Sequence, residues 1–160
     1  MRQALLAGLT LIQLFAGAST GQAEEWSRVR RVIDGDTLET TRAQRVRLVG
    51  VDAPEYRPWE GVVEPYGKEA GVFMRRHLTG RSVRLVRDRS DRDRYGRLLR
   101  YVYTEDGEMV NARLVREGLA EVKAYPPDTA RQNELMQAQA EARSSRRGLW
   151  SDAKTRKQRR

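Results

Sequence analysis

Short apolar runs rich in β-branched residues alternate with turn signals through the first two thirds of the chain. Gly, Asp and Pro follow these runs, and they favour turns because Gly tolerates positive φ and Pro restricts its predecessor. The pattern therefore predicts five strands, at residues 26–33, 37–40, 45–51, 82–86 and 97–103.

Residues 57–63 are predicted to form a loop, and three segments after it have helical periodicity instead. The first follows Pro65 and ends near Gly80, with one apolar face formed by Ala70, Phe73, Met74, His77 and Leu78. The others are a short helix over residues 110–117 and a longer one that begins at Asp128 or Thr129 and ends near Gly148. Five strands with these three helices suit an α+β fold, a Greek-key barrel of the OB type, which often binds oligonucleotides.

Carboxylates gather where two of the predicted strands end. Asp34 and Asp36 follow the first strand, while Asp52 and Glu55 follow the third, which also carries Arg47. Hard oxygen ligands of this kind suit Ca²⁺, Mg²⁺ or Mn²⁺ and not zinc. An isolated acidic turn is usually only a solvated hairpin, but a second acidic cluster with its own arginine favours a metal site.

The spacing of Arg47 and Asp52 conflicts with that site. In a regular strand, residues an odd number of positions apart point to opposite faces. The two side chains can converge only if the strand bends or ends between them, and Gly50 is the place where it can do so.

The net charge, the lack of cysteine and the single histidine limit the functions that the chain can have. The formal net charge of +9 favours a polyanionic partner, with nucleic acid first and anionic membrane second. The chain has no cysteine, which excludes disulfides, thiol nucleophiles and thiolate metal sites. It has one histidine, which excludes mechanisms that need two imidazoles. His77 lies on the apolar helical face, so we interpret it as a packed histidine bonded to backbone.

Both ends of the chain differ from the middle. Arg2 precedes an apolar run over residues 4–15 and then small residues, which is typical of a secretory signal peptide. We predict a signal peptide over residues 1–23, cleaved after Ala23 or alternatively Ala18, and no membrane span, because the run is too short. The folded domain then covers residues 24–150, and residues 151–160 form a basic disordered tail.

Five motifs, in this order, resemble the staphylococcal nuclease (thermonuclease) family. The resemblance extends from Trp26 to Trp150, and five ordered motifs are far more specific than any one alone. The motifs are residues 32–37, 47–55, 66–70, 93–97 and 109–120.

The resemblance implies a phosphodiesterase of the endonuclease type that uses Ca²⁺ and hydrolyses single-stranded DNA and RNA, leaving 3′-phosphates. Arg47 and Arg97 would hold the scissile phosphate, and Glu55 would orient or deprotonate the attacking water. Asp34 would shape the turn and support the metal ligands from behind, and would not be a direct ligand itself. The implied site residues are Arg47, Glu55 and Arg97 for catalysis, Asp36, Asp52 and the main-chain oxygen of Ala53 for the metal, and Arg94, Tyr95 and Tyr125 for substrate.

Two other functions stay open at this point. One is a non-catalytic nucleic-acid-binding OB barrel, because a fold alone does not establish chemistry. The other is an envelope-surface binding protein that uses the basic tail. We expect an exported monomer with no obligate protein partner, in the periplasm, in the medium or on the surface.

Overall fold

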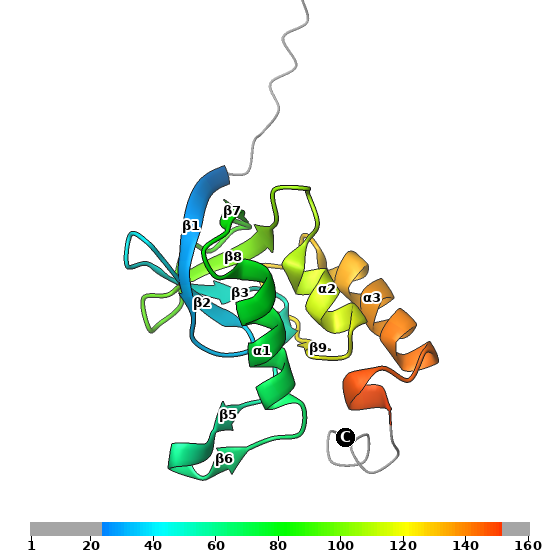
Figure 1. Cartoon of the computed structure of the whole chain (residues 1–160). Helices are drawn as coiled ribbons and strands as arrows, with labels where there is room; N and C mark the ends of the chain where they lie inside the picture. The colour runs from blue at the N-terminus through cyan, green and yellow to red at the C-terminus, as the bar shows by residue number, and fades with distance from the viewer. Residues whose placement is uncertain (1–23, 152–160) are drawn as a thin grey trace, which may run out of the picture.

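Five strands close into a barrel in the order β1, β2, β3, β8, β7 in the computed structural model, which describes residues 24–151 (Figure 1). The parallel pair is β3 with β8, and the other four pairs are antiparallel. This confirms the predicted α+β barrel. The barrel strands are β1 (Glu24–Val32), β2 (Thr37–Thr40), β3 (Arg45–Leu48), β7 (Ser82–Val86) and β8 (Leu98–Tyr103). The predicted signal peptide and nearly all of the predicted tail lie outside the described residues.

Apolar side chains from the strands fill the barrel. Leu38, Val46, Leu85 and Val102 have no exposed surface, and burial of each such side chain contributes about 1.5–3 kcal/mol. The helix α1 (Gly67–Leu78) packs against β1, whereas α2 (Val110–Arg116) packs against α3 (Gln132–Ser144). A 3₁₀ turn, η2 (Gly148–Trp150), follows α3 and buries Trp150.

Two helix predictions can be compared with their observed contacts. His77 lies on α1 with Nδ1 2.8 Å from the Phe73 carbonyl oxygen, which confirms that it is bonded to backbone. The prediction that α3 begins at Asp128 or Thr129 is wrong, because the helix begins at Gln132. The Asp128 carboxylate is used elsewhere: its Oδ1 accepts hydrogen bonds from the backbone N–H groups of Arg89 and Ser90.

The predicted third strand is broken. Its first part is β3, and its continuation β4 (Val51–Asp52) leaves the barrel to pair with β9 (Glu121–Val122). Gly50 lies at the break with a φ of 78°, and a Cβ added there would lie 2.5 Å from Leu135 Cδ1. Any other residue at position 50 would therefore be strained and would clash. The break places Arg47 and Asp52 on the same side, as the site requires.

Asn111 fastens the chain at this break. It has no exposed surface, its Oδ1 accepts a hydrogen bond from Val102 N–H, and its Nδ2 donates one to the Val49 carbonyl at 2.9 Å. The side chain thus joins the segment after β3 to the neighbouring strand β8.

Replacement of Asn111 with alanine is expected to destabilise the protein by about 3 kcal/mol or more, because it leaves a buried donor and a buried acceptor unpaired. Urea unfolding measures this change. Asn133→Ala is a suitable control, since Asn133 is an exposed asparagine in the first turn of α3. Equal stability of the two variants would contradict the role given to Asn111.

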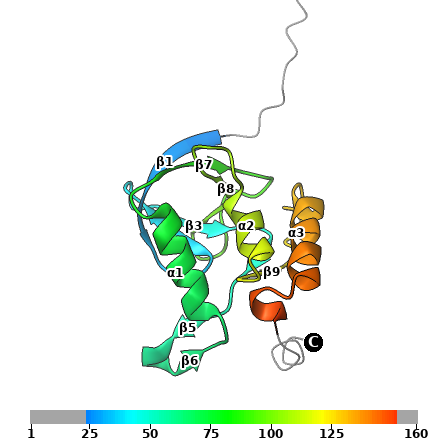
Figure 2. The ribbon, with the colours of Figure 1, turned by 45° about the vertical axis from the view of Figure 1, so that its right-hand side comes forward.

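A small hairpin extends from the barrel between β4 and α1. It consists of β5 (Tyr56–Arg57), the 3₁₀ turn η1 (Pro58–Glu60) and β6 (Val62–Val63). The sequence predicts only a loop here. Figures 1 and 2 show the hairpin below α1, pointing away from the barrel in both views. Within residues 24–151, no helix has the length and apolar character needed to cross a membrane.

Candidate active site

Asp36 lies in the turn between β1 and β2 and is 7% exposed. Its Oδ1 accepts a hydrogen bond from the Thr37 hydroxyl at 3.1 Å, and its Oδ2 accepts one from Ala53 N–H at 3.0 Å. Asp34 Oδ1 accepts a bond from Asp36 N–H, which confirms its expected role in the turn. A Cβ added to Gly35 would lie 2.6 Å from Ala53 Cβ, so the missing side chain lets the two acidic segments approach.

Arg47 links the two acidic clusters. Its Nη2 lies 3.0 Å from Asp36 Oδ2 and 3.1 Å from Asp52 Oδ1. Its Nη1 donates hydrogen bonds to the backbone carbonyls of Leu48 and Val51, on either side of the break after β3. The guanidinium is therefore fixed by four acceptors and is only 11% exposed. Of the predicted site residues, Asp36, Arg47, Asp52 and Ala53 are brought together in this way.

The environment of Asp36 disfavours its charge. Burial raises the pKa of Asp36 from an ordinary value of 3.8 to about 7, although the positive charge of Arg47 opposes this rise. The negative charge of Asp34 adds to the rise. A cation next to this carboxylate would favour its charged form.

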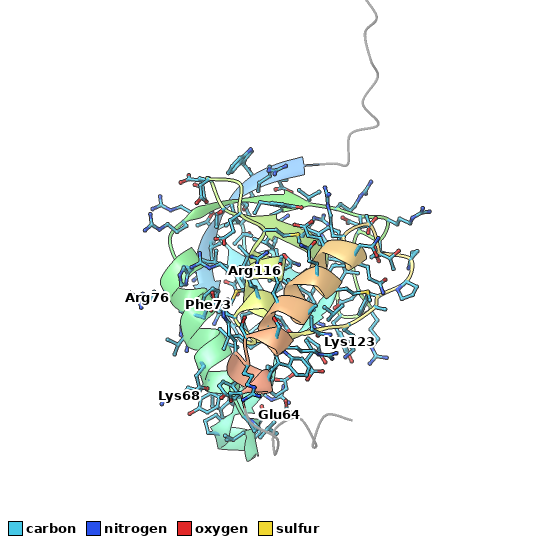
Figure 3. All side chains as sticks on the ribbon, turned by 90° about the vertical axis from the view of Figure 1, so that its right-hand side faces the viewer. Glu64, Lys68, Phe73, Arg76, Arg116 and Lys123 are labelled. Carbon is cyan, nitrogen blue, oxygen red and sulfur yellow. The ribbon has the colours of Figure 1, made fainter. Side chains whose placement is uncertain are left out.

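A cavity of about 570 Å³ opens beside Asp52. Asp52 Oδ2 lies 2.9 Å from the Nζ of Lys123, which the sequence analysis did not single out. Figure 3 labels Lys123 and Glu64, and shows Phe73 and Arg76 on α1 away from Lys123. Acidic side chains outnumber the single lysine around this cavity, which favours cations. The lining residues are Asp52, Ala53, Glu55, Glu64, Pro65, Glu121 and Lys123.

The donor set fits a hard divalent cation. Among residues 24–151, no three acidic or histidine side chains are close enough to form a complete metal site by themselves. Asp36 and Asp52, however, each place an oxygen about 3 Å from the same Arg47 nitrogen. Ca²⁺ accepts carboxylate, backbone carbonyl and water oxygens together, so two carboxylates and the Ala53 carbonyl suit it when water supplies the rest. This ligand set remains a prediction.

Glu55 begins the hairpin at the edge of the cavity. Glu55 N–H donates a hydrogen bond to Glu64 Oε2 at 3.0 Å, and Glu64 N–H donates one to the Glu55 carbonyl at 2.9 Å. The Glu55 carboxylate forms an ion pair with Arg57, whose Nη1 lies 3.2 Å from Oε2. Arg57 could not be predicted as part of the site, because it belongs to none of the acidic turns.

Arg97 lies between the turn at Gly96 and β8, the strand that neighbours β3. It directly precedes Leu98, which pairs with Val46 of β3. Its guanidinium Nε donates a hydrogen bond to Asp93 Oδ2 at 2.7 Å, so it contacts Asp93 and not the Asp36–Asp52 pair. Burial raises the pKa of Asp93, but hydrogen bonds from Arg97 and from Tyr95 N–H outweigh this effect and hold the pKa below its ordinary value. The structure thus places Arg97 just before a strand that pairs with β3, with its guanidinium bonded to Asp93.

The predicted substrate residues are on the surface. Tyr95 is 67% exposed, and the guanidinium carbons of Arg94 and Arg97 lie 4.8 Å and 5.5 Å from its ring centre. Tyr125 is 38% exposed, and its carbonyl accepts a hydrogen bond from Asp128 N–H. It follows Lys123 by two residues. Contact of these three residues with a substrate remains a prediction.

These features define a class: an OB-type barrel that carries arginines and carboxylates around an acidic cavity. A family model described as staphylococcal nuclease homologue matches residues 45–152. The chain is therefore a member of the staphylococcal nuclease family.

Individual relatives match most of the chain. It is 43% identical over 142 residues to a thermonuclease of Staphylococcus hyicus, which covers 86% of this chain and 83% of the relative. It is 45% identical over 139 residues to a thermonuclease of Staphylococcus intermedius, with coverage of 85% and 82%. An uncharacterized endonuclease of Escherichia coli O157:H7 is 42% identical over 135 residues, with coverage of 82% and 80%.

Proposed function

We propose that this chain is an exported, Ca²⁺-dependent endonuclease that hydrolyses single-stranded DNA and RNA and leaves 3′-phosphates. The class of enzyme follows from the family: the chain is a nuclease, a hydrolase of the endonuclease type, like its thermonuclease and endonuclease relatives. One observation supports the proposal of Ca²⁺-dependent cleavage. Arg47 lies between Asp36 and Asp52, next to the cavity that Glu55 lines.

Each residue has a task that its chemistry suits. The planar fork of Arg47 can donate two parallel hydrogen bonds to phosphate oxygens, and it stays protonated near neutrality. Arg97 would leave Asp93 for a second phosphate oxygen. Glu55 would accept a proton from the water that attacks phosphorus, and the bond from phosphorus to the 5′-oxygen would break. Ca²⁺ held by Asp36, Asp52 and the Ala53 carbonyl would supply positive charge to the phosphate and help to activate water.

The test follows cleavage of single-stranded DNA and RNA by the purified protein with Ca²⁺, with Mg²⁺ and with chelator. We expect cleavage that requires Ca²⁺ and a kcat lowered at least about a hundredfold in Glu55→Gln, comparable to the loss of one preorganised group. Glu69→Gln, on an exposed turn of α1, is the matched control. Tight binding without cleavage under any metal would instead support the non-catalytic barrel.

Export has its own measurement. We expect the protein outside the cytoplasm, and N-terminal sequencing of that fraction should find a chain that begins after Ala23 or Ala18. Retention of Met1 in exported protein would contradict a cleaved signal peptide.

A further inference from the structure

The tip of the β5–β6 hairpin presents an exposed tryptophan. Trp59 is 77% exposed, more than Tyr95 at 67% or Trp26 at 52%. It lies in η1, between the two strands of the hairpin that points away from the barrel in Figures 1 and 2. Large aromatic side chains contribute most to binding when a partner covers them, so this degree of exposure, on the hairpin that follows Glu55 at the acidic cavity, points to a contact with substrate.

A chain of polar contacts connects Trp59 to the candidate base. The indole N–H donates a hydrogen bond to Glu60 Oε1 at 3.2 Å. Glu60 Oε2 lies 2.8 Å from Arg57 Nε, and Arg57 Nη1 lies 3.2 Å from Glu55 Oε2. The indole is therefore connected to the Glu55 carboxylate through Glu60 and Arg57.

The charges of the hairpin favour a nucleobase over a phosphate group as the partner of Trp59. Glu55, Glu60 and Glu64 outnumber Arg57 there, so the tip attracts phosphate groups poorly. The indole face can stack on any nucleobase, because every base has a π-face. Trp59 lies four positions after Glu55, which is at most about 14 Å of extended chain. A base only a few nucleotides from the reacting phosphate can reach this distance.

We propose that the Trp59 indole stacks on an unpaired nucleobase of the strand whose phosphate is cleaved at Glu55. This inference rests on the proposed nuclease function and deepens it, because it selects single strands. In a duplex the bases are already stacked on one another, and Trp59 could bind one only at the cost of unstacking it. The phosphate would be held by the arginines and the base by the hairpin.

The test compares Trp59→Ala, Trp59→Phe and Trp26→Ala. Trp26 is an exposed tryptophan of β1 and provides the matched control. The substrates are a single-stranded oligonucleotide and an abasic strand of the same length, which has the phosphates but no bases. For Trp59→Ala we expect KM on the oligonucleotide to rise about fivefold to a hundredfold, the range for loss of one stacked base. On the abasic strand KM should stay unchanged, as should the hydrolysis rate of a mononucleotide aryl phosphodiester.

Trp59→Phe separates stacking from the hydrogen bond to Glu60, because phenylalanine keeps the aromatic face and lacks the N–H donor. Recovery of most of the affinity by this variant supports stacking. An equal rise of KM on both strands, failure of phenylalanine to restore affinity, or an equal effect of Trp26→Ala would overturn the proposal.

A second readout separates this proposal from the proposed function. Binding of the labelled oligonucleotide is measured by fluorescence anisotropy in chelator, where no cleavage is needed. If the wild-type protein cleaves nothing with any metal, the proposed nuclease function fails. The Trp59 proposal then stands if Trp59→Ala loses the same fold of affinity in this assay, and it fails if affinity is unchanged.

Discussion

Replacement of Arg47 with alanine is expected to lower kcat at least about a hundredfold and also to destabilise the protein. The loss of activity follows because one preorganised donor to a charged transition state is worth about 3–4 kcal/mol. The loss of stability follows from the contacts of the guanidinium with Asp36, Asp52 and two backbone carbonyls. Its removal leaves a buried carboxylate without its positive neighbour, which costs about 3 kcal/mol or more. Steady-state kinetics and urea unfolding measure the two effects.

Arg45→Ala is the control for this experiment. Arg45 lies on the same strand two residues earlier, but its side chain is exposed, so the variant loses the same charge without the buried contacts. We expect it to keep kcat and stability. If Arg47→Ala and Arg45→Ala have the same kcat and the same stability, Arg47 neither holds the phosphate nor stabilises the broken strand.

Replacement of Asp36 with asparagine is expected to move activity and stability in opposite directions. Cleavage should fall at least about a hundredfold, because the variant loses a predicted ligand of the metal. The metal-free protein should become more stable at pH 8. Burial raises the pKa of Asp36 to about 7, so at pH 8 the wild-type fold buries a charged carboxylate that the unfolded chain exposes to water. Asparagine avoids the ionisation cost, and we expect a gain of about 2 kcal/mol after its weaker hydrogen bonds are deducted.

The pH dependence gives the sign of this effect. A carboxyl with a raised folded pKa contributes stability below its unfolded pKa, and this contribution is lost as pH rises toward the folded value. Relative to wild type, Asp36→Asn should therefore gain little near pH 4 and gain the full amount above about pH 7. Unfolding in chelator at pH 4, 6 and 8 measures the trend. Asp52→Asn is the matched control, because its side chain is 45% exposed and should lose activity without the gain in stability.

The local sequence motifs predicted several of the side chains that lie together at the candidate site. Asp36 and Asp52 could be predicted because carboxylates at turns suit cation coordination, and Arg47 because its guanidinium suits phosphate; the structure brings the three together. Their convergence depends on the break at Gly50, which the odd spacing required and the glycine permitted. The alternation rule failed here because β4 leaves the barrel to pair with β9, a contact between residues far apart in the sequence.

Residues supplied by irregular segments were not predicted. Lys123 follows β9, which pairs with β4, and Arg57 lies in the β5–β6 hairpin next to Glu55. Neither residue belongs to a periodic pattern. The β5–β6 hairpin was expected to be a loop, since strands of two residues leave no detectable alternation. The start of α3 was also misplaced, because Asp128 binds the backbone of residues 89 and 90 instead of capping the helix.

The closed barrel has a consequence for how this site can change. Arg47 lies on a strand with hydrogen-bonded neighbours on both sides, and Arg97 directly precedes the adjoining strand β8. Adjacent strands keep a spacing of about 4.8 Å, so the sheet sets the distance between the backbone of Arg47 and that of Leu98, the residue after Arg97. Glu55, Arg57 and Trp59, in contrast, belong to a two-stranded hairpin outside the barrel. Adaptation to new substrates is thus expected to accumulate in the hairpin, while the barrel strands keep the backbone next to both arginines in place.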